Sequence, residues 1–340
     1  MPSPLYRPIE PTFRTQFAEL KDRADGAGAL LPGTPGHVVL RRGTGYAYWY
    51  RGYYSVPGQA VEDLVGKDGD EATLVAMRER IDFANWTARQ VRDLRKLGFQ
   101  VADKGVARVL VELHNAGLFE AGLVMVGTLA HMAWMNELGA HTVGARTQDI
   151  DLARRQPLKL AAPLSFLDAV AATKLKFVPV PGMPSKTPST SVKLPGAQGL
   201  RIDLLANGSP AGQVVPVREL QWHAQAIPFY DYLLRDARDA VMLAGGHCIP
   251  VKLPAPERLV WHKLYASVAR KANPSKAQKD LLQAATLVAV LLEQDDGSLD
   301  AAKPPRELKD AARQRLPALQ DAMASHPQAL AELMRAIGQR

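Results

Sequence analysis

Apolar residues recur at helical spacing along the first part of the chain. Leu74, Ile81 and their neighbours fall near one face of a repeat of about 3.6 residues, which predicts a long helix over 70–99. The same pattern predicts helices at 12–24 and 104–116. Between the first two helices, the stretch "HVVLRRGTGYAYWYRGYYSVPG" holds aromatic residues punctuated by Gly and Pro, so it predicts a small antiparallel sheet or hairpin.

In the middle of the chain, the pattern alternates between short strands and helices. The apolar run 123–126 predicts a strand, and 128–138 predicts a helix that ends at a glycine. Further along, "TQDIDLA" and "GLRIDLLA" predict strands, and "LSFLDAVAATKLK" predicts a helix between them. The intervening "PGMPSKTPSTSVKLPGAQG", which carries Lys186 and Lys193, predicts a mobile loop. From Pro254 onward the pattern is helical almost throughout.

This alternation indicates an α/β (α+β) protein built from several cooperating units. At 340 residues the chain exceeds the usual single-domain size of roughly 100 to 200 residues. We expect an N-terminal module with the aromatic and basic hairpin, a core with a small mixed sheet, and a C-terminal helical bundle. Their predicted ranges are 1–100, 101–250 and 251–340.

Composition narrows the class of protein. A hydrophobic content of 47% with 22% charged residues fits a protein with a sizeable core. No apolar run approaches the roughly 20 residues that span a bilayer, and the first residues lack the apolar stretch of a signal peptide, so we expect a cytoplasmic protein without membrane contact. The single cysteine, Cys248, excludes an internal disulfide and is expected to be buried. A net charge of +8 favours phosphate-bearing partners, although a solvated basic surface explains it as well.

Two aspartates lie one residue apart in the predicted strand "TQDIDLA". Alternate side chains of a strand point to opposite faces, so Asp149 and Asp151 are expected side by side on one face. A third carboxylate, Asp203, interrupts the apolar strand "GLRIDLLA" in the same way. Grouped carboxylates raise one another's pKa unless a cation lies between them, and hard ions such as Mg²⁺ prefer these oxygen ligands. The alternative is that Asp149 begins a turn and Asp203 is a charge on an edge strand.

Gly127 and Thr128 lie where a predicted strand meets a helix. A helix start directs free backbone N–H groups and a partial positive charge at any anion placed there. Gly allows a phosphate to approach the backbone, and the Thr hydroxyl adds a donor. An ordinary strand-to-helix turn with Thr as the helix cap explains the same pair.

The motifs "VMVGT", "DIDL" and "RIDLL" follow one another in this order. The sequence thereby resembles the polymerase-beta-type nucleotidyltransferase superfamily, whose core has h-G-[ST], a helix, [DE]-h-[DE]-h and a later acid on a strand. It looks similar to bacterial nucleotidyltransferase-fold proteins with "VGT" and a "RTQDIDFA"-like segment, and more distantly to abortive-infection and MenT-type toxin nucleotidyltransferases. The match covers about 120–210. Twenty residues separate Thr128 from Asp149, more than in minimal members, so an insertion or a longer helix is expected there.

The resemblance implies roles for these residues. Gly127 and Thr128 would hold the triphosphate of an NTP, while Asp149 and Asp151 would bind Mg²⁺ or Mn²⁺. With Asp203 as a third ligand, two metal ions could be held, and Asp203 would help to activate an acceptor hydroxyl. A nucleoside monophosphate would be transferred and pyrophosphate released.

The helical third of the chain adds charged candidates. Lys263 and Arg270 fall on one face of a predicted helix, and Asp280 lies on an inward-facing line of the next. The toxin-type relatives carry a Lys on one helix and a Lys-Asp pair on the next, which Lys263 and the pair Lys279 and Asp280 match. These residues would steady phosphate, or they form a structural ion pair between helices or a solvated face. Arg146, before the first aspartate strand, either binds phosphate or is a surface residue.

The acceptor is a separate question. Six aromatic residues between Tyr46 and Tyr54 lie beside Arg41, Arg42 and Arg51, and such groups stack on and neutralise single-stranded or looped nucleic acid. Tyr and Trp are also good strand formers. With the basic charge, RNA such as tRNA is the first expectation, and a protein or small-molecule hydroxyl remains open.

The combined prediction is a metal-dependent nucleotidyltransferase, which could act as the toxin of a toxin-antitoxin or abortive-infection system with an antitoxin partner. The alternative is a catalytically inactive nucleic-acid-binding protein with the same fold.

Overall fold

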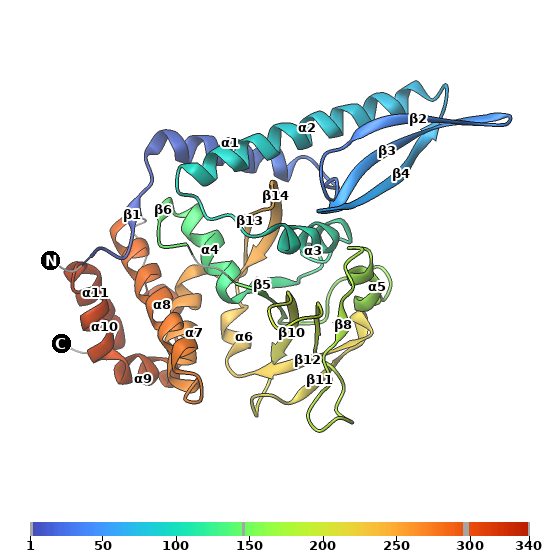
Figure 1. Ribbon diagram of the computed structural model, residues 1–340. Coiled ribbons are helices and arrows are strands. Elements are labelled where there is room, and N and C mark those ends of the chain that lie inside the picture. Colours follow the sequence, from blue (N-terminus) through green and yellow to red (C-terminus); the bar gives the residue numbers. More distant parts are fainter. Residues whose placement is uncertain (1–2, 145–146, 295–298, 339–340) are drawn as a thin grey trace.

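The computed structural model describes residues 3–144, 147–294 and 299–338 (Figure 1). Its centre is a mixed sheet in the order β11-β12-β10-β7-β5. The strands of this order are β5 (Val124–Val126), β7 (Asp149–Arg154), β10 (Arg201–Asn207), β11 (Val214–Val217) and β12 (Trp222–Ile227). Strand β10 runs parallel to both β7 and β12, whereas β5 is antiparallel to β7. With helices packed around it, this sheet confirms the predicted α+β fold class.

The two aspartate strands are direct neighbours. In the parallel ladder Asp203 pairs with Asp151, and Arg201 pairs with Asp149. Ile150, between Asp149 and Asp151, and Ile202, next to Asp203, are both fully buried. The alternation predicted for both strands is therefore observed, with apolar side chains on one face and carboxylates on the other.

Part of the segment predicted as a mobile loop is a strand instead. Strand β9 (Ser191–Lys193) pairs antiparallel with the first half of β10, and β8 (Val178–Pro179) pairs with β9. Strand β12 pairs only with the second half of β10, so the first half needs another partner for its backbone groups. The predicted "LSFLDAVAATKLK" helix is also shorter, because α5 spans only Phe166–Ala171.

A nearly fully buried helix follows β5. Helix α4 spans Gly127–Glu137, and its residues from Leu129 to Asn136 are all buried. It packs against the hairpin of β13 (Arg238–Ala244) and β14 (His247–Leu253), which also contacts α3 (Lys104–Asn115). Cys248 in β14 is buried, as expected. The short strands β1 (Arg7–Pro8) and β6 (Ala140–His141) pair beside this core, and β6 occupies part of the gap before Asp149.

The N-terminal part forms two long helices and a separate sheet. The helices are α1 (Pro11–Asp25) and α2 (Glu71–Lys96). Asp70 is the N-cap of α2, and its side chain accepts a hydrogen bond from the N–H of Thr73. The antiparallel sheet contains β2 (His37–Gly43), β3 (Tyr46–Val56) and β4 (Gln59–Lys67). In Figure 1 this blue sheet projects from the body at one end of α2.

The C-terminal part is helical, as predicted. Its helices are α7 (Pro256–Ala269), α8 (Pro274–Gln294), α9 (Arg306–Gln314), α10 (Leu316–Ala322) and α11 (Pro327–Ile337), with a single-turn helix at Asp300–Ala302. They lie on the opposite side of the molecule from the β2-β3-β4 sheet (Figure 1). A short helix, α6 (Tyr230–Leu233), precedes β13, and a single-turn helix at Arg218–Leu220 precedes β12. Among the described residues, no helix is long and apolar enough to cross a membrane.

Candidate functional site

Three carboxylates lie on one face at the start of β7 and β10. Burial, followed by the neighbouring charges of Asp203 and Asp149, raises the pKa of Asp151 to about 7, while Arg270 and Lys263 oppose the rise. Among the described residues, no Lys, Arg or His forms an ion pair with Asp151. Asp151 is therefore a carboxylate whose negative charge is poorly compensated within the protein.

Asp203 is compensated more directly. Arg201 Nε donates to Asp203 Oδ1 at 2.8 Å, and its other end donates to Ser191 Oγ at 2.9 Å. Burial raises the pKa of Asp203, and the charge and hydrogen bond of Arg201 oppose this rise. Ser191 belongs to β9, the strand in the stretch predicted as a loop. This strand therefore helps to fix the orientation of the Asp203 carboxylate.

Gly127 lies against Asp151, because Val126 at the end of β5 pairs with Asp151 in β7. Gly127 has φ +71°, and a Cβ at this position would fall 2.1 Å from Asp151 Oδ2. Only a residue without a side chain fits here, since the backbone conformation and the carboxylate both exclude one. The helix cap is Val126 and makes no side-chain cap bond, so Thr128 is in the first turn of α4 and is not the cap.

The first turns of α8 face Asp149. Lys276 Nζ lies 4.0 Å from Asp149 Oδ2, and the Asp149 side chain is 42% exposed. Burial lowers the pKa of Lys279, the next basic residue on this helix, and the charge of Lys263 lowers it further. A basic helix start therefore lies beside the outermost of the three carboxylates.

Lys263 and Asp280 form a buried ion pair between α7 and α8. Lys263 Nζ donates to Asp280 Oδ1 at 3.2 Å and to Gln283 Oε1 at 2.6 Å, and Arg270 Nε lies 3.2 Å from Asp280 Oδ2. Burial lowers the pKa of Lys263, and Asp280 and Asp151 oppose this. The interhelical ion pair considered from the sequence is therefore present, and it lies within electrostatic range of Asp151.

Several residues near the carboxylates carry no sequence motif. Tyr230 is buried, and burial followed by the charge of Asp151 raises the pKa of its hydroxyl. Lys276 could have been found from the sequence, because Asn273 and Pro274 form a typical helix start. Tyr230 could not, because the preceding Phe229 has an unusual φ of 63° and the helix that follows has four residues.

The donor set is suited to Mg²⁺ or Mn²⁺, since carboxylate oxygens are hard ligands and Asp151 lacks a cationic partner among the described residues. Within the described ranges, however, no three His, Cys, Asp or Glu side chains form a group that could hold a metal ion. A metal site with all three aspartates therefore stays a prediction. Arg146 lies outside the described residues, so its phosphate role stays a prediction too.

Comparison with known proteins identifies the family of the chain. No curated protein matches the chain. A solved structure, an antigenic nucleotidyltransferase-like protein from Paracoccidioides brasiliensis, is similar at 18% identity and a TM-score of 0.36, over 66% of this chain and 91% of that one. The family model described as Nucleotidyltransferase matches residues 104–331, a range that holds every candidate residue above. The chain therefore belongs to this nucleotidyltransferase family.

Proposed function

We propose that this protein transfers a nucleoside monophosphate from an NTP to an acceptor hydroxyl and releases pyrophosphate. Family membership supports nucleotidyl transfer in general. The observation that carries the proposal is the register that places Asp203 beside Asp151, with Gly127 packed against the Asp151 carboxylate. This arrangement joins the three sequence motifs in one place.

The proposed roles follow from charge and burial. Asp149 and Asp151 would hold Mg²⁺ or Mn²⁺, with Asp203 beside them, and a bound ion would supply charge neutralisation for the phosphates. Asp203 would accept the proton of the acceptor hydroxyl, and Arg201 keeps its carboxylate oriented through the 2.8 Å hydrogen bond.

The leaving pyrophosphate carries negative charge that basic residues can stabilise. Lys276 and Arg270 are partly exposed at 57% and 46%, so their charged ends reach solvent near the carboxylates. Lys263 is buried and already bonded to Asp280 and Gln283. We therefore assign direct phosphate contact to Lys276 and Arg270, and we assign Lys263 the role of holding α7 against α8 while adding positive potential.

RNA, such as tRNA, is our proposed acceptor, and the β2-β3-β4 sheet supports it in part. Tyr46 and Tyr54 are 57% and 53% exposed and could stack on bases. The arginines differ from one another: Arg41 is paired with Glu62, and Arg51 is buried and donates to backbone carbonyls such as Pro35 O. Of the three arginines, Arg42 is the exposed one without an acidic partner among the described residues.

The test is incubation of the protein with each labelled NTP, Mg²⁺ or Mn²⁺, and total cellular RNA or protein. Label in the RNA fraction identifies the donor and the acceptor together. Salt-dependent RNA binding without NTP consumption would instead favour the inactive nucleic-acid-binding alternative.

A toxin role would rest on the same chemistry. If the transfer modifies an essential RNA, expression should arrest growth, and the double variant Asp149→Asn/Asp151→Asn should not. Arrest by both forms would separate toxicity from nucleotidyl transfer.

A further inference from the structure

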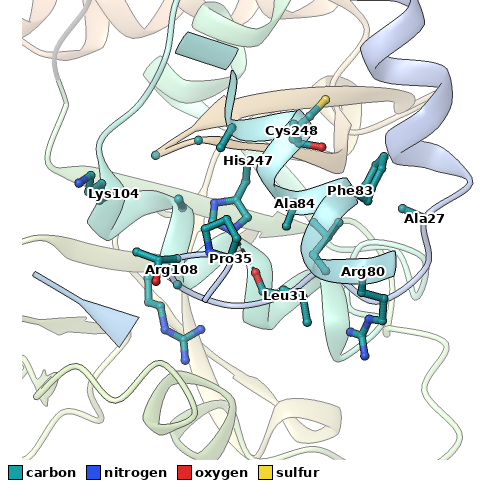
Figure 2. Close-up of a pocket in the computed structure, with 18 of the residues that line it drawn as sticks. Ala27, Leu31, Pro35, Arg80, Phe83, Ala84, Lys104, Arg108, His247 and Cys248 are labelled. Carbon is teal, nitrogen blue, oxygen red and sulfur yellow. Dashed lines mark hydrogen bonds between the residues drawn. The ribbon is translucent and has the colours of Figure 1, made fainter. Parts of the chain in front are cut away.

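A large cavity lies between the N-terminal helices and the core, apart from the candidate site. It measures about 1080 Å³ and is lined by residues of α2, of the segment after α1, of the β3–β4 turn, of α3 and of the β13–β14 turn (Figure 2). Tyr54, proposed above to stack on RNA, lines the cavity, but none of the residues assigned above to the carboxylate site or to phosphate contact does. Most of the residues that line the cavity come before residue 104 in the sequence, where the match to the family model begins. Its volume is slightly above the range of roughly 300 to 1,000 Å³ that is typical of small-molecule sites.

The inner wall of the cavity is apolar and held in place. Figure 2 shows Phe83 and Ala84 on one side and Leu31 and Pro35 beside His247. The His247 ring bonds to the carbonyl of Leu31 at 3.0 Å, which ties the β13–β14 turn to the segment after α1. Apolar surface arranged in this way favours a ligand with an apolar body.

The charges that line the cavity are mostly positive. Five basic residues and one acid, Glu79, contribute to the described lining. Two of the five are already engaged, since Arg23 pairs with Glu19 and Arg108 with Glu112. The remaining basic residues, Arg80, Arg92 and Lys104, have no acidic partner among the described residues. Arg80 and Lys104 lie on opposite sides of the apolar group in Figure 2.

One buried hydroxyl also lacks a partner. Thr87 lines the cavity from α2 and is only 6% exposed, and its side-chain oxygen has no hydrogen-bond partner among the described residues. An unpaired buried hydroxyl costs stability unless a ligand or water satisfies it. The cavity therefore combines an apolar wall, uncompensated cations and a free hydroxyl.

We propose that this cavity binds a small organic anion with an apolar, ring-containing body. The body packs against Phe83, Ala84 and Leu31, the anionic group pairs with Arg92 and Lys104, and Thr87 donates or accepts one hydrogen bond. Because the wall is shared by the N-terminal helices and the core, the ligand holds these two parts together. This binding does not depend on the nucleotidyl transfer proposed above.

The test uses two fluorescent probes that differ by one charge. The anion 8-anilinonaphthalene-1-sulfonate and its neutral analogue N-phenyl-1-naphthylamine are titrated against the full chain, with thermal unfolding of each variant as the check on folding. We expect one sulfonate probe per chain, bound at least about tenfold more tightly than the neutral probe, as expected for one charge-assisted contact.

Two variants locate the probe. Ala84→Trp places a large ring where the apolar body of the probe would pack and should abolish binding of both probes, whereas Ala72→Trp, at an exposed position of α2 outside the lining, should not. Arg92→Ala with Lys104→Ala should weaken the sulfonate about tenfold and leave the neutral probe unchanged. Arg89→Ala, an exposed arginine of α2 outside the lining, is the charge control.

Four results of these experiments would contradict the proposal. Unchanged sulfonate binding by folded Ala84→Trp would mean that the probe lies elsewhere. Equal affinity for both probes would indicate a site for neutral ligands. Should Ala84→Trp fail to fold, the Arg92→Ala/Lys104→Ala variant decides, and unchanged sulfonate affinity there rejects the anion site. If sedimentation shows a dimer and the dimer does not bind the sulfonate probe, the wall of the cavity is instead a contact surface for a second copy of the chain.

Discussion

At the scale of single residues, the absence of a Cβ at Gly127 leaves the space that the Asp151 carboxylate occupies. The sequence suggested that this glycine lets a phosphate approach the backbone. In the structure the space of its missing side chain is taken by Asp151, since a Cβ would fall 2.1 Å from Oδ2. The type of residue was predictable from the motif, but this contact was not, because it depends on the antiparallel register of β5 and β7.

We expect Gly127→Ala to lower the rate of nucleotidyl transfer about a hundredfold, because a carboxylate displaced by about 1 Å is misplaced for catalysis. The matched control is Gly117→Ala, since Gly117 has a similar φ of +68° but nothing within 4 Å of the added Cβ. Both variants carry a strained backbone, so both should lose about 1 to 2 kcal/mol of stability. Equal activity of the two variants would show that the Asp151 contact has no role in transfer.

His131 gives a prediction about acid stability. It is buried in α4 with neither ring nitrogen hydrogen-bonded among the described residues, and burial, then the charges of Lys263 and Lys279, lower its pKa to about 3. The unfolded chain takes up this proton near pH 6.5 and the folded chain only near pH 3, so stability is lost as pH falls through this window.

At pH 5 the loss from His131 alone should be about 2 kcal/mol relative to neutral pH. The His131→Gln variant lacks this proton, so its free energy of unfolding should fall less than that of the native protein between pH 7.5 and pH 5. Chemical denaturation at both pH values measures this, with the exposed His37→Gln as the control. A parallel fall in the native protein and His131→Gln would contradict the assignment.

At the scale of elements, the helix pair α7 and α8 brings charge to the sheet. The sequence predicted that Lys263 and Asp280 lie on facing helices, and the structure joins them at 3.2 Å. It did not show that Lys276 lies beside Asp149 or that Arg270 pairs with Asp280, because the first contact depends on how α8 meets β7 and the second on how α7 meets α8. Helical periodicity defines a face, whereas the packing of that face against a sheet depends on the whole core.

A double variant separates the structural and the functional role of this pair. Asp280→Leu alone should lower the free energy of unfolding by about 3 to 5 kcal/mol, because it leaves the buried charge of Lys263 without an acidic partner. Lys263→Met alone should cost less, because Arg270 still pairs with Asp280. The double variant should recover most of this loss, since apolar residues of similar size replace the pair. If Lys263 also supplies positive potential near Asp151, transfer should stay impaired in the stable double variant. Full activity in that protein would reduce the pair to a structural contact.

Element prediction failed most where pairing is not local. Strand β9 lies in a stretch rich in Pro, Ser and Thr, which is typical of a loop. It forms because the first half of β10 has a free edge, and its Val192 is fully buried. Strands β5, β7 and β10 were predictable because each carries a continuous or alternating apolar pattern of its own.

At the scale of the whole molecule, the chain separates a projecting aromatic sheet from the family core. The sheet lies on the opposite side from the C-terminal helices in Figure 1. The order of its aromatic residues predicted strands, and this is observed, but sequence alone could not show that Arg51 is buried and bonded to backbone carbonyls. Residue type does not indicate which side of a sheet faces solvent until the register is known.

If this sheet binds RNA, Tyr46→Ala with Arg42→Ala should weaken binding of a single-stranded RNA by about 1 to 3 kcal/mol, and affinity should fall as salt rises. Filter binding or fluorescence anisotropy at several salt concentrations measures both effects. The control is Leu64→Ala, an exposed apolar residue of the same sheet. If only the Leu64→Ala control loses RNA binding, or if the Tyr46→Ala/Arg42→Ala variant keeps full RNA binding, the acceptor does not bind at these residues of the sheet.

The central claim is that the carboxylates of β7 carry nucleotidyl transfer. The direct measurement is label transfer from NTP to RNA by the native protein and by Asp149→Asn/Asp151→Asn, with Asp321→Asn on α10 as a control that keeps the three carboxylates. We predict that the double variant folds, loses transfer completely, and that the control transfers at the native rate. Undiminished transfer by the folded double variant would contradict the assignment of this site.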